Sequence, residues 1–468
     1  MEKPLFIDTH AHLDDSRFGD DRAEVVARAK EAGVHKIISV GCWSRKKGFK
    51  VLLDEVLSYY EFVYAALGIH PHEAKEVTND EPYELIKKLA LESKGRAVAI
   101  GETGLDYHYD HSPRDKQKEV FRRQLALARE LSLPVIIHTR EAEKDTLEVL
   151  KEEGVNETGG VFHCFSGTLD MAKKALDMGL HLSFTGVITF PNAGVLREVV
   201  KAVPIESMLI ETDCPYLAPH PNRGKRNEPA FVVDTAKAIA EIKRLSLEDV
   251  ARITTRNAED LFGLNKRTEE AKIAYPIRNA LYLNLTNRCS NYCTFCAKFK
   301  SYTVKGHYLK LSEEPDFDDV IRAIGPDPED KYEEIVFCGF GEPLIRLDLV
   351  KEVGMYLKRR GCRIRIDTDG LANLVHKRNV LPELMFVDVI SVSLNAPDSE
   401  TYQKLIKTPF GDNAYPAILF FLREAKKHIS KVVASVVTVP GLDIEACRKV
   451  AEDDIGVAFR VREYNTVG

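Results

Sequence analysis

The sequence predicts an α/β protein with two domains, a TIM-type (β/α)8 barrel followed by a partial (β/α)6 barrel. The chain has 468 residues, which is too long for one ordinary hydrophobic core. Short apolar runs alternate with stretches of helical periodicity, and such alternation is typical of a parallel sheet. Side chains that can bind metal follow several of the apolar runs, as on the catalytic face of a barrel.

The first strand is expected at Phe6-Ile7-Asp8-Thr9 and runs into His10-Ala11-His12. In a strand, two histidines one residue apart leave the same face and can converge on one cation. A His-x-His pair near the start of a chain is more often partly exposed than metal-bound. The metal hypothesis therefore requires further ligands at the ends of other strands.

Four more apolar runs meet that requirement. The runs at 97–100, 134–137, 160–162 and 208–210 lead to Glu102, His138, His163 and Asp213. Helices are expected between the strands, from Asp21 to Ala32 with Gly33 closing it, and over 118–133, where apolar residues recur at helical spacing. Further strands are expected at 36–40, 62–66 and 180–185.

Two loops could contact a substrate. His70 and His72 follow the strand at 62–66, where we expect them to support the site or cap a turn. The loop from His220 to Pro229 contains Arg226 and Asn227, and is either a solvated loop or a phosphate clamp beside the site. Its position after Asp213 slightly favours the clamp.

These segments together resemble the motif series of the TatD family of metal-dependent deoxyribonucleases. The motifs run in order up to about Leu264, and they are Asp8-Thr9-His10-Ala11-His12, Gly68-Ile69-His70-Pro71-His72, Gly101-Glu102-Thr103-Gly104-Leu105-Asp106-Tyr107, His163-Cys164-Phe165-Ser166-Gly167, Glu211-Thr212-Asp213-Cys214-Pro215-Tyr216 and Arg226-Asn227-Glu228-Pro229. The resemblance implies a TIM barrel with a two-metal site that is intact in this sequence.

The resemblance also implies roles for individual residues. One cation would be held by His10, His12, Glu102 and Asp213, and the other by Glu102, His138 and His163. Glu102 would bridge the two cations, and Asp213 would orient a water or take its proton. Zn, Mn and Mg all suit imidazole and carboxylate ligands. Two such ions would activate water and neutralise a phosphodiester.

The expected activity of this half is hydrolysis of DNA, as an exonuclease on single-stranded ends. His70, Arg226 and Asn227 are the expected substrate contacts. The alternative is an ester or amide substrate such as a D-aminoacyl-tRNA, because an activated water attacks carbonyl carbon as readily as phosphorus.

Composition sets limits on partners and location. The formal net charge of −6 argues against a broadly basic surface that coats nucleic acid, so polyanion binding must come from the site itself. No apolar run is long enough to span a bilayer and no signal peptide precedes the first strand, so a cytoplasmic location without membrane contact is expected. Nine cysteines then favour reduced thiols and metal ligation over disulfides.

The domain pattern changes after the barrel. We assign residues 1–265 to the first domain, 266–276 to a charged linker and 277–468 to the second domain. The second domain begins with the strand 280–285, and Cys289, Cys293 and Cys296 follow it. Zinc usually needs a fourth protein ligand, and none stands nearby at a suitable spacing. Three thiolates instead leave one iron of a 4Fe-4S cube open, so a cluster is preferred to zinc.

A glycine-rich turn strengthens this interpretation. The strand 334–338 ends in Gly339-Phe340-Gly341-Glu342-Pro343, where missing side chains let the backbone approach a ligand. A three-cysteine loop followed by such a turn resembles the radical SAM superfamily, and the whole chain resembles a TatD protein fused to a TatD-associated radical SAM protein.

This second resemblance implies a 4Fe-4S cluster on Cys289, Cys293 and Cys296, with S-adenosylmethionine (SAM) contacted by the residues of the glycine-rich turn and of a later strand end, which are Gly339, Gly341, Glu342 and Ser393. Asp369 stands where asparagine is commoner in the superfamily. A reduced cluster would cleave SAM to methionine and a 5'-deoxyadenosyl radical, with electrons from a donor such as flavodoxin or ferredoxin. The alternative makes this half a non-catalytic binding module. The radical substrate and the oligomeric state stay open.

Overall fold

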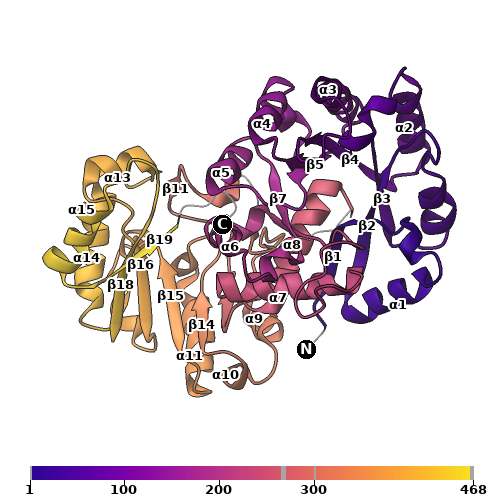
Figure 1. Cartoon of the computed structure of the whole chain (residues 1–468). Helices are drawn as coiled ribbons and strands as arrows, with labels where there is room; N and C mark the ends of the chain where they lie inside the picture. Colours follow the sequence, from indigo (N-terminus) through magenta and orange to yellow (C-terminus); the bar gives the residue numbers. More distant parts are fainter. Residues whose placement is uncertain (1–2, 265–269, 300–301, 464–468) are drawn as a thin grey trace. The chain divides into compact units, whose positions relative to one another are not determined.

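The structure, a computed structural model, describes residues 3–264, 270–299 and 302–463. The chain folds into two compact units, residues 1–267 and 268–468 (Figure 1). Part of the predicted linker, residues 266–269, lies outside the described residues. The last part of that predicted linker does not form a loop, because a strand, β9 (Ala274–Ile277), begins inside it.

The N-terminal unit is an eight-stranded parallel sheet whose strands follow one another in chain order. This confirms the predicted TIM-type architecture. Its strands are β1 (Phe6–Ala11), β2 (Val34–Cys42), β3 (Val63–Gly68), β4 (Ala97–Asp106), β5 (Val135–Arg140), β6 (Gly160–Phe162), β7 (His181–Phe184) and β8 (Met208–Ile210).

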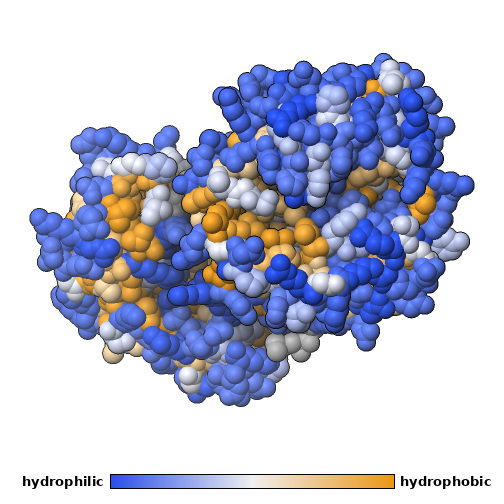
Figure 2. Space-filling model, in the orientation of Figure 1, coloured by the Kyte–Doolittle hydropathy of each residue, from blue (hydrophilic) through white to orange (hydrophobic). Residues whose placement is uncertain are grey.

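Helices follow the strands and surround the sheet (Figure 1). They are α1 (Arg22–Ala32), α2 (Glu81–Glu92), α3 (Arg114–Leu131), α4 (Glu143–Glu152), α5 (Leu169–Asp177), α6 (Gly194–Ala202), α7 (Val232–Lys243) and α8 (Leu247–Phe262). The first helix ends as the sequence predicts, because Gly33 takes a left-handed conformation with φ +100°. Around α2 and α3 the visible surface is hydrophilic (Figure 2).

The barrel is closed where its first and last strands end. His12 N–H donates to Cys214 O at 2.8 Å, and Asp213 N–H donates to His10 O at 2.9 Å. The side chain of Asp8 adds two hydrogen bonds across the seam, accepting from Thr212 N at 2.9 Å and from Thr212 Oγ1 at 2.6 Å. The two ends of the barrel sequence therefore meet at its carboxyl-terminal face.

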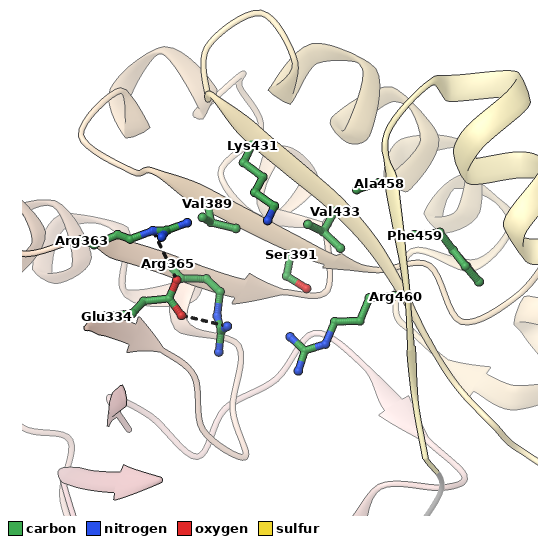
Figure 3. A pocket seen from close by; sticks show the side chains of 10 residues that line it. All are labelled: Glu334, Arg363, Arg365, Val389, Ser391, Lys431, Val433, Ala458, Phe459 and Arg460. Atoms are coloured by element: carbon green, nitrogen blue, oxygen red, sulfur yellow. Dashed lines mark ion pairs between the residues drawn. The ribbon is translucent and has the colours of Figure 1, made fainter. Parts of the chain in front are cut away.

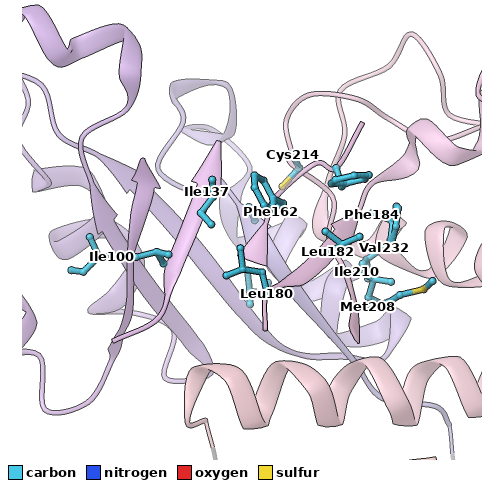
Figure 4. Close-up of a cluster of buried hydrophobic side chains, with 14 of the residues drawn as sticks. Ile100, Ile137, Phe162, Leu180, Leu182, Phe184, Met208, Ile210, Cys214 and Val232 are labelled. Carbon is cyan, nitrogen blue, oxygen red and sulfur yellow. The ribbon is translucent and has the colours of Figure 1, made fainter. Parts of the chain in front are cut away.

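Two apolar layers hold the barrel strands in place. One face packs on the helices through side chains such as Ile137, Phe162 and Leu182 (Figure 4). The other face contributes Ile136, Val161 and Leu209 to a second buried cluster. By strand alternation, the second set shares its face with His138, His163 and Glu211, which lie two positions further along the same segments. Close-packed side chains thus support the carboxyl-terminal ends on which the site stands.

The C-terminal unit contains a seven-stranded mixed sheet in the order β19-β18-β16-β15-β14-β10-β9. Six of these strands are parallel, as the sequence predicts for a partial barrel, whereas β9 pairs antiparallel with β10. Besides β9, the strands are β10 (Ala280–Leu283), β14 (Glu334–Phe337), β15 (Ile364–Thr368), β16 (Val389–Ser393), β18 (Lys431–Val437) and β19 (Ala458–Arg462).

One face of this sheet packs on helices in a separate apolar core. The helices of the unit are α9 (Phe317–Ile324), α10 (Pro328–Lys331), α11 (Leu347–Arg359), α12 (Ala372–Val375), α13 (Ser399–Leu405), α14 (Ala414–Ala425) and α15 (Ile444–Lys449). Short strands pair as β11 (Tyr292–Cys293) with β17 (Ile406–Lys407) and as β12 (Thr303–Val304) with β13 (His307–Tyr308). Across the described residues of both units, no helix has the length and apolarity to cross a membrane.

Candidate metal centre and cysteine loop

Glu102 stands at the centre of the candidate metal site and faces two separate pairs of histidines. Its Oε1 lies 2.7 Å from His138 Nδ1 and 2.7 Å from His163 Nε2. Its Oε2 lies 3.6 Å from His10 Nε2 and 4.0 Å from His12 Nε2. One carboxylate can therefore serve two cations, one through each oxygen.

The first ligand group consists of His10, His12, Asp213 and the Oε2 of Glu102. The Nε2 atoms of His10 and His12 are 3.2 Å apart, and Asp213 Oδ1 is 3.5 Å from His12 Nε2 and 3.8 Å from His10 Nε2. A tetrahedral ion with bonds of about 2.1 Å holds its ligand atoms about 3.4 Å apart. The spacing of these donors fits one divalent ion.

The second ligand group consists of His138, His163 and the Oε1 of Glu102. His138 Nδ1 and His163 Nε2 are 3.2 Å apart, so two ring nitrogens again point at a common space. His70, predicted to contact substrate, places its Nε2 only 3.5 Å from Glu102 Oε1. His70, Glu102 and His138 thus form a further group whose ligand atoms all lie within 4.8 Å of one another.

Local backbone geometry brings these side chains together. Asp213 has a left-handed φ of +55°, which turns the chain immediately after β8. Gly104 in β4 has a φ of +145°, and a Cβ there would lie 1.9 Å from His138 O. Only glycine lets β4 come this close to β5, and this approach brings Glu102 beside His138.

Three buried carboxylates support the site, although the sequence interpretation gave them no role. Asp106 Oδ2 lies 3.2 Å from His138 Nε2. Glu211 Oε1 accepts from Cys164 N at 2.6 Å and lies 3.4 Å from His163 Nδ1. The third is Asp8, at the barrel seam. For Asp8 the signal was spacing, because it precedes His10 by two positions in β1 and such pairs share a strand face. Glu211 likewise precedes Asp213 by two positions.

The electrostatics of the pocket favour anionic carboxylates beside cations. Burial acts to raise the pKa of Glu102, but His163, His70 and His10 outweigh it and lower that pKa well below its usual value. Burial acts to lower the pKa of His12, but the carboxylates of Asp213 and Glu102 raise it to about 9. The carboxylates thus favour positive charge at this position, and divalent ions bound by nitrogen and oxygen ligands would supply it.

The predicted phosphate clamp is engaged in contacts within the protein. Arg226 forms two hydrogen bonds with the carboxylate of Asp21, at 2.8 and 2.5 Å. Asn227 is fully buried, and its amide donates to Thr212 O at 2.8 Å and to Tyr216 O at 2.6 Å. Both side chains hold the loop after β8 in place, and their contact with substrate stays a prediction.

The three cysteines of the second half lie on one loop beside a two-stranded ribbon. Cys293 is in β11, and Cys296 N–H donates to Cys293 O at 3.1 Å. Burial, followed by the nearby thiols of Cys289 and Cys296, raises the pKa of Cys293. Among the described residues, the groups of three ligand side chains with all atoms within 4.8 Å belong to the barrel unit. Three thiols on one short loop are the kind of ligand that an iron–sulfur cluster takes.

The glycine-rich turn packs directly against the segment that precedes the cysteines. A Cβ on Gly339 would lie 2.3 Å from Asn284 Oδ1, and one on Gly341 would lie 2.2 Å from Thr286 O. Glu342 N–H donates to Arg288 O at 2.8 Å. The glycines therefore allow the turn to come close to the protein's own backbone.

Buried polar contacts link this turn to the cysteine loop and to the next strand. Glu342 is 3% exposed and accepts from Thr368 Oγ1 at 2.8 Å and from Asp369 N at 2.7 Å. Asp369 in turn accepts from Ser290 Oγ at 2.6 Å. Ser393, the remaining predicted SAM contact, accepts from an Arg462 guanidinium nitrogen at 3.2 Å. The ends of β14 and β15 and the cysteine loop thus meet in one region.

Comparison with known families assigns both units. The model of the TatD related DNase family matches residues 7–263, and the model of the radical SAM superfamily matches residues 283–453. Both family matches agree with the two resemblances found in the sequence.

Relatives of the barrel unit match it over almost their whole length. "Uncharacterized metal-dependent hydrolase YabD" of Bacillus subtilis is 48% identical, over 56% of this chain and 100% of the relative. "3'-5' ssDNA/RNA exonuclease TatD" of Pantoea ananatis is 36% identical, over 55% of this chain and 99% of the relative. The crystal structure of YjjV, a TatD homologue from Escherichia coli, is 32% identical with a TM-score of 0.52, and covers 56% of this chain and 98% of that chain. The chain therefore belongs to the TatD family of metal-dependent hydrolases and carries a radical SAM domain after its barrel.

Proposed function

We propose that the barrel unit is a two-metal phosphodiesterase that hydrolyses DNA from single-stranded ends. The observation that carries this proposal is the position of Glu102, whose two oxygens face two different pairs of histidines. The Pantoea ananatis relative, named as a 3'-5' exonuclease for single-stranded DNA and RNA, supports a nucleic-acid substrate.

We assign each residue of the site to one of the two ions or to the attacking water. His10, His12 and Asp213 would hold one ion, His138 and His163 would hold the other, and Glu102 would bridge them. Zn, Mn or Mg would supply Lewis-acid chemistry and neutralise the charge of a phosphodiester. Asp213, whose Oδ1 lies 3.5 Å from His12 Nε2, would orient a water or accept its proton.

The test is digestion of end-labelled single-stranded DNA by the metal-loaded full chain. Asp213→Asn is expected to reduce cleavage by about a thousandfold, because the proton acceptor and an anionic ligand are lost together. Asp260→Asn is the matched control, since Asp260 is an exposed helix residue paired with Arg256. If intact DNA is left uncut while an aminoacyl ester is turned over, the site acts on carbonyl esters instead.

We further propose that the C-terminal unit holds a 4Fe-4S cluster on Cys289, Cys293 and Cys296 and binds SAM near Gly339, Gly341 and Glu342. The observation that supports this is the meeting of the cysteine loop with the glycine-rich turn through Ser290, Asp369 and Glu342. Cluster and SAM together supply one-electron chemistry that cleaves SAM reductively. A small donor such as flavodoxin or ferredoxin would deliver the electron.

This second proposal is tested under anaerobic conditions. Reconstituted protein with dithionite and SAM is expected to release 5'-deoxyadenosine, and Cys293→Ala is expected to abolish both this product and the brown chromophore. Cys362→Ala is the matched control, because Cys362 is buried in the apolar core. DNA cleavage should survive in Cys293→Ala. Absence of 5'-deoxyadenosine from wild-type protein with a full complement of iron would favour a non-catalytic binding module.

A further inference from the structure

The face of the C-terminal sheet opposite its helices carries several cationic side chains. Ile366, Ile390 and Ala434 point into the helix-covered core, so strand alternation places their neighbours on the other face. The register aligns Arg365 with Val389 and Val389 with Lys431, and it aligns Ser435 with Arg460. Positive side chains therefore project from this face on three different strands.

A cavity of about 250 Å³ lies on this face, in the half of the sheet nearer the amino-terminal ends of the strands. Its polar lining consists of Glu334, Arg363, Arg365, Ser391, Lys431 and Arg460 (Figure 3). Valine side chains at 389 and 433 contribute an apolar wall. The volume is enough for about eight water molecules at about 30 Å³ each, and so for a small organic anion.

The charges of the cavity are only partly balanced from within the protein. Glu334 Oε2 lies 2.9 Å from Arg365 Nη1, and Glu334 Oε1 lies 3.8 Å from Arg363 Nε. Arg365 is held further by the Tyr282 hydroxyl, to which it donates at 3.1 Å. Arg365 Nε also lies 3.1 Å from Asp367 Oδ1. Glu334 and Asp367 thus balance the two arginines, and Lys431 and Arg460 remain as the excess positive charge of the cavity.

Two cations and one hydroxyl remain available for a ligand. In the parts of the chain that the structure describes, neither Lys431 nor Arg460 has an ion-pair partner, and the Ser391 hydroxyl has no hydrogen-bond partner. Ser391 is 6% exposed and lines the cavity, so its hydroxyl is open to a ligand there. Figure 3 shows the polar ends of Lys431, Ser391 and Arg460 on the same side of the sheet.

We propose that this cavity binds the anionic group, a phosphate ester or a carboxylate, of a small molecule on which the radical SAM domain acts. A guanidinium fork and an ammonium suit oxyanions, and the hydroxyl adds a neutral donor. Ser391 lies two positions before Ser393 on the same face of β16, so the anion would lie deeper along the strands than the expected SAM site. The inference rests on the proposed radical SAM function of this unit.

Residue-specific acetylation of the full, anaerobically reconstituted chain tests the proposal. Inorganic pyrophosphate and malonate serve as probes of the two anion classes, with chloride as the reference at equal ionic strength. A bound anion covers Lys431 and keeps its ammonium protonated, so a millimolar probe is expected to slow acetylation of Lys431 at least about threefold. Lys449, an exposed lysine on α15 outside the cavity, is the matched control. Reading each lysine by mass spectrometry separates this cavity from the metal site of the barrel.

The outcomes distinguish this inference from the function on which it rests. The anion site is supported if either probe slows acetylation of Lys431 but not of Lys449. This protection of Lys431 should be lost in Arg460→Met and in Ser391→Ala. The more effective probe identifies the anion class. The anion site is rejected if Lys431 is acetylated at the same rate with and without the probes. It is also rejected if the probes protect Lys449 as much as Lys431. Release of 5'-deoxyadenosine is measured in the same samples, so a failure of SAM cleavage with Lys431 still protected would reject the radical function and leave the anion site standing.

Discussion

Asp106 Oδ2 lies 3.2 Å from His138 Nε2, on the side of the imidazole ring opposite the nitrogen that faces Glu102. The same carboxylate oxygen is 3.1 Å from His72 Nε2. A histidine that donates one N–H to a carboxylate presents the lone pair of its other nitrogen to a metal, in a fixed orientation and with raised basicity. Asp106 is thus a positioning residue for the second ion.

Asp106→Asn should therefore weaken the second metal site without removing any ligand. We expect metal affinity or DNA cleavage to fall about 10- to 100-fold, because the amide is uncharged and a weaker acceptor for the His138 N–H. Metal titration followed by cleavage assays at saturating metal measures both effects. Cleavage unchanged from that of Asp260→Asn would show that Asp106 does not orient His138.

Removal of the metal ions should destabilise the barrel unit selectively. The candidate site concentrates buried carboxylates and histidines, and a ligand at about a thousand times its dissociation constant stabilises the folded state by about 4 kcal/mol. Chelation is expected to lower the thermal midpoint of the barrel, abolish DNA cleavage and leave the unfolding of the C-terminal unit unchanged. Both effects should reverse on adding Zn or Mn. A barrel transition that is insensitive to chelation would contradict the proposed ion-binding site.

The stability of the barrel should depend on the titration of His181 at the start of β7. Burial lowers the pKa of this histidine from 6.5 to about 4, and its Nδ1 is buried without a hydrogen-bond partner among the described residues. Below pH 6.5 the unfolded chain gains a proton that the folded barrel does not, so stability is lost as pH falls toward 4. The loss is up to about 3 kcal/mol.

Urea unfolding of wild-type and His181→Asn proteins across this pH range measures the effect. As pH falls from 7 to 4.5, we expect the free energy of unfolding of the wild type to fall more than that of the variant. A constant difference would indicate that His181 takes up its proton in the folded state as readily as in the unfolded chain.

Gly341→Ala should disrupt the junction between the glycine-rich turn and the cysteine loop. The added Cβ would lie 2.2 Å from Thr286 O and 2.5 Å from Arg288 O, and backbone atoms cannot move aside cheaply. We expect the C-terminal unit to lose about 2 kcal/mol of stability, together with iron content. Gly194→Ala is the control, because a Cβ there meets nothing within 4 Å. Unchanged iron binding in Gly341→Ala would argue against the role given to this junction.

The overall fold could be predicted because its signals are local. Apolar runs and helical periodicity repeat within windows of about 10 residues, and they identify the strands and helices of both barrels. Strand β9 was missed because its four residues, Ala-Tyr-Pro-Ile, contain a proline and lie next to a charged connector. Its position in the sheet depends on antiparallel pairing with β10, which no local pattern encodes.

The candidate site was likewise predictable where its signals are local, and not where it depends on contacts between distant segments. Strand-end residues such as His10, Glu102 and His138 could be found from the runs that precede them, and the structure brings them together. The partners of Arg226 could not, because its ion pair with Asp21 joins segments about 200 positions apart. The open cations of the C-terminal sheet, Lys431 and Arg460, were likewise invisible, since a single charge in a strand gives no indication of whether a neighbouring strand neutralises it.

The seam between Asp8 and Thr212 has a consequence for the newly made protein. During synthesis His10 leaves the ribosome long before Asp213. These two side chains are proposed to bind the same ion. Until the eighth strand has emerged and docked, a nascent chain cannot assemble the complete coordination shell. Hydrolysis would thus begin only after the eighth strand has paired with the first.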